Sequence, residues 1–104
     1  MEIKSYYDSG RLIVRLVGEI DHHTAKTIRD DIDGLIISHN PKELILDLSG
    51  VDFMDSSGLG LVLGRYKKQS DLGGEMRIIN PTKRISQILQ LAGVDRIIKI
   101  EKIG

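Results

Sequence analysis

Residues 43–48 read Glu-Leu-Ile-Leu-Asp-Leu, and residues 56–72 read Ser-Ser-Gly-Leu-Gly-Leu-Val-Leu-Gly-Arg-Tyr-Lys-Lys-Gln-Ser-Asp-Leu. In the first stretch the leucines alternate, which places them on one side of a β-strand. In the second stretch apolar residues recur with the period of a helix, and the expected buried face consists of Leu59, Val62, Leu63 and Tyr66. Gly73-Gly74 ends this helix, and residues 76–79 are typical of another strand. The middle of the chain therefore predicts a strand, a helix and a second strand.

The sequence before this unit predicts a hairpin and a further helix. Residues 2–7 and 11–18 flank Asp8-Ser9-Gly10, a cluster typical of the turn between two antiparallel strands. A helix is expected over about residues 22–38, with Asp21 as its N-cap and Asn40-Pro41 at its end. Its buried stripe is expected to consist of Ala25, Ile28, Ile32, Leu35 and Ile36.

The sequence after the unit predicts a third helix over about residues 82–92 and a final strand over 97–100. The helix is expected to bury Ile85, Ile88 and Leu89. The resulting order, β-β-α-β-α-β-α-β, indicates an α/β fold with a largely parallel sheet of about five strands. Because the chain has 104 residues and a mass of 11.6 kDa, we expect a single domain over residues 1–104.

The composition excludes several kinds of protein. There is no cysteine, which excludes disulfides, thiolate metal sites and a cysteine nucleophile. The 15 Lys and Arg balance the 15 Asp and Glu, so the chain lacks the basic charge of a general nucleic-acid binder. No apolar run approaches the roughly 20 residues that cross a bilayer, and the start does not resemble a signal peptide. We therefore expect a cytoplasmic protein that binds neither nucleic acid nor membrane.

The densest candidate site is residues 53–60, Phe-Met-Asp-Ser-Ser-Gly-Leu-Gly, between a strand and a helix. In open α/β sheets, ligands gather beyond the carboxyl ends of the strands. Asp55 or Ser56 is expected to be the N-cap of the helix, and one interpretation of the segment is a well-capped helix start. The other interpretation is a phosphorylation site on a serine, because helix N-termini favour anions.

Three catalytic or nucleotide-binding motifs fail at this segment. The dinucleotide pattern GxGxxG, begun by Gly58 and Gly60, requires glycine at position 63, which is Leu63. No P-loop sequence is present, and the hydrolase elbow GxSxG fails at Met54. Gly60 and Gly64, four residues apart on one helix face, indicate either close packing of the helix on the sheet or a flat patch for a partner.

Asp21-His22-His23 is the second candidate cluster. Adjacent side chains on a helix point about 100° apart, so the two histidines are poorly placed to share a metal, and we expect none. The alternatives are a capped helix start with exposed histidines, or a loop that faces a partner or a phosphate. Because this segment also follows a strand, we expect Asp21 to lie near the Ser56 hydroxyl.

Two segments together resemble a known family. Residues 18–24, Gly-Glu-Ile-Asp-His-His-Thr, and residues 53–60, continued by Leu63-Gly64-Arg65-Tyr66-Lys67, resemble the STAS-domain anti-sigma factor antagonists. The likeness covers nearly the whole chain and is greatest to the antagonists that act in sporulation. Family members often have a further C-terminal helix, whereas this sequence stops at Gly104, so no role of that region is carried over.

The resemblance implies a switchable binding protein. The unphosphorylated antagonist binds an anti-sigma factor that is also a serine kinase, and so releases a sigma factor for transcription. ATP or ADP is bound by that kinase, so we expect no cofactor on this chain. We also expect the chain to be a monomer. Phosphorylation of the serine after Asp in D-S-S-G, here Ser56, ends the interaction, and a serine phosphatase reverses it. Ser57 is the alternative acceptor.

The partner-binding residues that the resemblance implies lie in the same two segments: Asp21, His22, His23, Thr24, Asp55, Ser56, Ser57, Gly58, Leu59 and Gly60.

Two other functions compete with this interpretation. One is an enzyme with Ser56 as nucleophile, helped by His22 or His23, against which the missing elbow glycine argues. The other is direct nucleotide binding, against which the lack of a phosphate-cradling loop argues.

Overall fold

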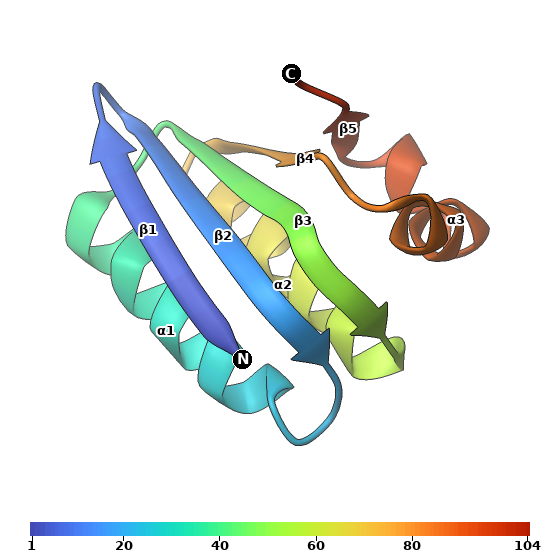
Figure 1. The fold of residues 1–104 in the computed structure, drawn as a ribbon. Helices are drawn as coiled ribbons and strands as arrows, with labels where there is room; N and C mark the ends of the chain where they lie inside the picture. The colour runs from blue at the N-terminus through green and yellow to red at the C-terminus, as the bar shows by residue number, and fades with distance from the viewer.

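The computed structural model describes residues 1–104 and contains one five-stranded sheet, whose strands lie side by side in chain order (Figure 1). The strands are β1 (Glu2–Asp8), β2 (Arg11–Ile20), β3 (Glu43–Met54), β4 (Glu75–Ile79) and β5 (Lys99–Glu101). β1 and β2 form the predicted antiparallel hairpin, and β2 to β5 are parallel to one another. The predicted α/β class and largely parallel sheet are confirmed.

Three α-helices and one 3₁₀ turn connect the strands: α1 (Ala25–His39), α2 (Ser56–Asp71), α3 (Lys83–Leu91) and η1 (Val94–Arg96). α1 and α2 lie behind the sheet in Figure 1, and α3 lies toward its β4–β5 end. None of the helices has the length and apolar character that a membrane span requires.

The hydrophobic core lies between the sheet and the helices. The alternating leucines Leu44, Leu46 and Leu48 of β3 are fully buried, as their pattern predicts. Leu12, Val14 and Leu16 of β2 and Ile28, Ile32 and Ile36 of α1 are also fully buried. Each such side chain stabilises the fold by roughly 1.5–3 kcal/mol relative to its exposed state. The apolar residues from which the fold is predicted are therefore also the ones that stabilise it.

The chain differs from the prediction where polar residues interrupt the patterns. β3 continues to Met54 instead of ending at residue 48, because β2 extends to Ile20 and pairs with it. Ser49 and Gly50 interrupt the alternation in β3, and its register with β2 shifts between Asp47 and Gly50 and again between Val51 and Phe53. The sequence pattern therefore stops short of the true end of the strand. The last strand lies at 99–101 rather than 97–100, because residues 94–96 form the turn η1.

The buried face of α2 also differs from the predicted one. Val62 is buried as predicted, but Leu61, Arg65 and Gln69 are buried as well. The other predicted core residues are only partly buried: Leu59, Leu63 and Tyr66. The Gln69 side-chain amide donates to the Pro41 carbonyl over 2.8 Å, so a polar residue occupies a core position. Polar side chains on the buried face hide its period in the sequence.

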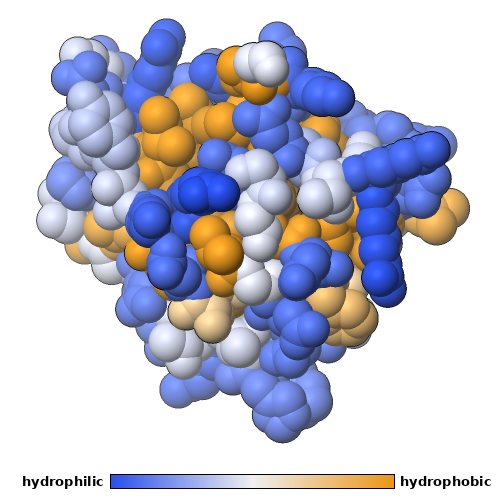
Figure 2. All heavy atoms as spheres, viewed as in Figure 1, coloured by the Kyte–Doolittle hydropathy of each residue, from blue (hydrophilic) through white to orange (hydrophobic).

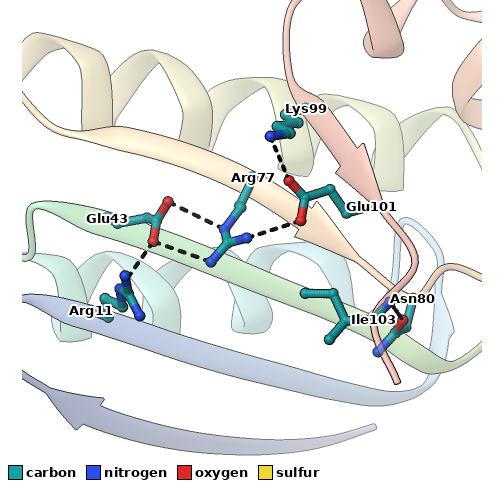
Figure 3. A network of polar contacts seen from close by, with 7 residues as sticks. All are labelled: Arg11, Glu43, Arg77, Asn80, Lys99, Glu101 and Ile103. Carbon is teal, nitrogen blue, oxygen red and sulfur yellow. Dashed lines mark hydrogen bonds and ion pairs between the residues drawn. The ribbon is translucent and has the colours of Figure 1, made fainter.

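The opposite face of the sheet, turned toward the viewer in Figure 2, carries charged side chains interspersed with apolar ones. Figure 3 shows a chain of ion pairs across four strands of this face. Arg77 Nε lies 3.2 Å from Glu43 Oε2, and Arg77 Nη1 lies 3.0 Å from Glu101 Oε2. Arg11 extends the chain to Glu43 over 3.5 Å, and Lys99 to Glu101 over 2.8 Å. The hydrogen bond from Lys99 is the main cause that lowers the pKa of Glu101.

Candidate functional site

The candidate site lies at the carboxyl ends of β2 and β3, at the lower edge of the sheet in Figure 1. Ile20 and Met54, the last residues of the two strands, are paired in the sheet. The Asp55 N–H also donates to the Ile20 carbonyl over 3.2 Å. The two segments singled out in the sequence therefore lie side by side, although about thirty residues separate them in the chain.

Asp55 caps α2 and leaves Ser56 free. The Asp55 Oδ1 atom accepts hydrogen bonds from the Ser57 N–H over 2.8 Å and from the Gly58 N–H over 3.3 Å. Of the two candidates for the N-cap, Asp55 is therefore the one that the structure shows. Ser56 is the first residue of α2, and its side chain is exposed. Its hydroxyl makes no hydrogen bond within the chain, so it is accessible to a partner.

The residues after Ser56 fit α2 closely onto the strand ends. Ser57 is half-buried and faces the groove between α1 and α2, so the two serines point into different surroundings. A Cβ atom on Gly58 would lie 2.4 Å from Met54 Cγ and 3.1 Å from Ile20 Cγ2, so this position accepts only glycine without displacement. Leu59 packs against the core.

Asp21 organises the loop between β2 and α1. Its Oδ1 atom accepts from the His23 N–H over 2.9 Å and from the Thr24 N–H over 3.0 Å. The Thr24 hydroxyl accepts from the Asp21 N–H over 3.1 Å and donates to the Glu19 carbonyl over 3.0 Å. The Thr24 N–H is the main cause that lowers the pKa of Asp21, with burial opposing it. Asp21 is thus the cap of a turn, and α1 begins at Ala25 rather than at the predicted residue 22.

The two histidines of this loop diverge in their surroundings. Their ring centroids lie 3.9 Å apart, but His22 faces the groove that Ser57 lines. His23 faces a separate hollow beside Met1 and Ile3. No group of three or more His, Cys, Asp or Glu side chains is placed to hold a metal ion.

Gly60 and Gly64 give α2 a bare stretch of backbone. A Cβ atom on either residue would have no neighbouring atom within 4 Å. Close packing of the helix on the sheet, one of the two interpretations of this pair, is therefore wrong. The pair instead lies on open surface: Gly60 is exposed and lines the groove that Ser57 also lines, and Gly64 lines a neighbouring hollow.

The sequence patterns do not single out the basic residues beside the site. Lys26 and Arg29 of α1 and Arg65 of α2 face one groove together with Ser57. Lys26 and Arg29 stand three residues apart on one face of α1, which was the available signal, although such a pair is also common on solvated helix faces. Arg65 lies on the buried face of α2, and that position can be recognised only from the structure, which shows which face is buried.

Comparison with known proteins gives the same fold and a family. The STAS domain model matches residues 2–103. An anti-sigma F factor antagonist of Paenibacillus polymyxa is 39% identical over 100 residues, which cover 96% of this chain and 86% of the relative. The solved structure of the anti-sigma factor antagonist SpoIIAA in its unphosphorylated form has a TM-score of 0.85 and 28% identity, and covers 99% of this chain and 89% of that one. SpoIIAA in its phosphorylated form has a TM-score of 0.77 at 28% identity, covering 99% and 92% of the two chains.

Proposed function

This chain belongs to the STAS-domain family of anti-sigma factor antagonists, with SpoIIAA among its relatives, and on that premise we propose that it is a phosphorylation-controlled binding protein. Unphosphorylated, it binds an anti-sigma factor that is also a serine kinase and thereby releases a sigma factor of the sporulation type. Transfer of a phosphate to Ser56 ends the interaction, and a serine phosphatase restores it.

The observation that carries this proposal is the state of Ser56. Its exposed, unbonded hydroxyl stands at the first residue of α2, directly after the capping residue Asp55. A kinase must bring the γ-phosphate of its nucleotide in line with the acceptor oxygen, and an exposed, unbonded hydroxyl permits that approach. Ser57 is less suited as the acceptor because it is half-buried and faces the groove.

The structure gives the enzyme alternative no support at Ser56. A serine nucleophile needs a base within hydrogen-bond reach. No side chain of the chain bonds the Ser56 hydroxyl, and His22 faces the groove lined by Ser57 instead. The relatives found by comparison carry the names of regulators.

Mass spectrometry after incubation with the host's anti-sigma kinase and ATP tests the proposal. We expect one phosphate on Ser56 in the unaltered protein, the same phosphate in Ser57→Ala, and none in Ser56→Ala. All three proteins should bind the anti-sigma factor before ATP is added. Phosphate on Ser57, or no binding of the unaltered protein, contradicts the proposal.

A further inference from the structure

A groove between α1 and α2 opens directly beside the candidate site. Its volume is about 470 Å³, and the α1 side of the groove carries Lys26 and Arg29. Ser57, Gly60 and Arg65 line the α2 side, and His22 extends the groove toward the loop of Asp21. No acidic side chain lines it.

Arg65, one of the residues that line this groove, has a hydrogen-bond donor without a partner. Its side chain is only 8% exposed, and its Nε atom lies 2.8 Å from Asp33 Oδ1 in an ion pair with α1. The Nη1 nitrogen is buried without any hydrogen-bond partner. Burial lowers the pKa of Arg65, yet an arginine stays protonated at neutral pH, so this nitrogen remains a cationic donor. A buried donor without an acceptor is costly, so an acceptor that reached this nitrogen would be bound favourably.

The other cations of the groove also point to an anionic occupant. Lys26 is exposed and has no carboxylate within ion-pair distance, and Arg29 pairs only with the exposed Asp30 over 3.4 Å. With Arg65, these residues place three cationic side chains around one opening. An anion at this position gains charge-assisted hydrogen bonds from a fork-shaped arginine donor as well as Coulomb attraction.

The position of Ser56 bears on whether the anion in the groove is a nucleotide phosphate or a side chain of the partner. The nucleotide phosphate must lie at the Ser56 hydroxyl, and Ser56 does not line the groove. The anion that suits the groove is therefore distinct from the transferred phosphate, and a carboxylate side chain of the same partner fits the three cations there. The bare backbone at Gly60, where a Cβ would meet nothing within 4 Å, lets the main chain of that partner come close.

We propose that the groove between α1 and α2 binds an aspartate or glutamate side chain of the anti-sigma factor, which pairs with Lys26, Arg29 and the Nη1 nitrogen of Arg65. This inference rests on the proposed function and adds a second contact to it. The carboxylate supplies the acceptor that Arg65 lacks and anchors the partner beside Ser56.

Titration of the ADP-loaded anti-sigma factor with groove variants tests the proposal. Lys26→Glu and Arg29→Glu reverse exposed charges without touching the core. Each should raise the Kd by about tenfold or more, equivalent to about 1.4 kcal/mol. Lys83→Glu and Arg84→Glu on α3 are the matched controls, because both residues are exposed and lie away from the site. They should bind like the unaltered protein.

A charge swap identifies the partner's residue. Among partner variants in which one surface Asp or Glu is replaced by Lys, one should bind Arg29→Glu more tightly than it binds the unaltered antagonist. Groove variants that bind as tightly as the α3 controls overturn the groove contact while leaving the proposed function in place. If the unaltered protein does not bind at all, both proposals fall.

Calorimetry with ATP and no partner addresses a different occupant. We expect no saturable heat from ATP with the unaltered protein. Saturable ATP binding that Arg29→Glu abolishes makes a free nucleotide the occupant and overturns the assignment to a partner carboxylate.

Discussion

Ser56 and Ser57 are neighbours in the chain, and neither hydroxyl makes a hydrogen bond, but only the Ser56 side chain is exposed. Asp55 supplies the cap of α2, so the Ser56 side chain contributes no hydrogen bond to the fold. We expect Ser56→Ala to change the free energy of unfolding by less than about 0.5 kcal/mol while abolishing phosphate uptake, because alanine is a good helix former at an exposed position. Asp55→Ala, the control that removes the cap, should cost about 1 kcal/mol. Urea denaturation of the two variants measures this difference, and equal losses contradict the assignment of the cap.

A substitution of Asp21 tests whether the loop between β2 and α1 contributes to phosphorylation. Asp21→Asn keeps an oxygen that can accept from the His23 and Thr24 N–H groups but removes the charge. We therefore expect an intact fold and a slower rate of phosphorylation, measured by phosphate incorporation over time. Asp52→Asn, which changes an exposed acidic residue near the end of β3, serves as the control and should react at the normal rate. Normal kinetics in Asp21→Asn would remove the carboxylate from the site.

The lowered pKa of Asp21 predicts an acid-dependent loop. The hydrogen bond from the Thr24 N–H stabilises the ionised carboxylate in the folded protein. A lowered folded pKa means that this stabilisation is fully present above the ordinary pKa of 3.8 and is lost as the pH falls through the lower folded value. The amide signals of His23 and Thr24 should therefore shift below pH 3.8 in NMR titrations, and should not follow this titration in Asp21→Asn. A titration midpoint of these amide signals above the ordinary pKa of 3.8 would contradict the prediction.

At the scale of elements, α2 contains glycines with opposite roles. Gly58 lies against Met54 and Ile20, whereas Gly60 has open space where a Cβ would be. Gly58→Ala should destabilise the protein by about 1–3 kcal/mol and displace the first turn of α2, because the added methyl overpacks the strand ends. Gly60→Ala should stabilise it by up to about 1 kcal/mol, because alanine is the better helix former. Thermal unfolding measures both, and changes of the same sign contradict this interpretation.

Sequence patterns predict an element well when one face is uniformly apolar. The alternation of Leu44, Leu46 and Leu48 predicts the first half of β3 correctly, and all three side chains are buried. The pattern fails where polar groups enter the core, as Arg65 and Gln69 do on α2, since their partners on other elements are not visible in the local sequence. For the same reason the two site segments can be predicted from strand ends, whereas the groove of Lys26, Arg29 and Arg65 requires the packing of α1 on α2.

At the scale of the whole molecule, the arrangement favours a local switch. The fully buried core lies between the sheet and the helices, and Ser56 is an exposed residue beyond the strand ends. The amides of Ser57 and Gly58 already donate to Asp55, so the helix start does not offer them freely to a phosphate, as its sequence alone would suggest. We therefore expect that a phosphate on Ser56 would be hydrated mainly by water, beside the Asp55 carboxylate, and that the core would not rearrange.

The last prediction is that phosphorylation weakens binding without refolding the domain. The phosphate adds roughly −1.5 to −2 charges beside Asp55. A partner surface that covers it must desolvate a dianion next to a carboxylate, which should cost several kcal/mol, and each 1.4 kcal/mol or so weakens binding about tenfold. Ser56→Asp should mimic the effect only in part, because it carries one charge on a shorter side chain. Backbone amide NMR of the free and phosphorylated protein should show shifts confined to residues near 19–24 and 53–62, with a much higher Kd for the anti-sigma factor. Shifts that spread through the sheet and α3 would instead mean that the phosphate moves the whole fold.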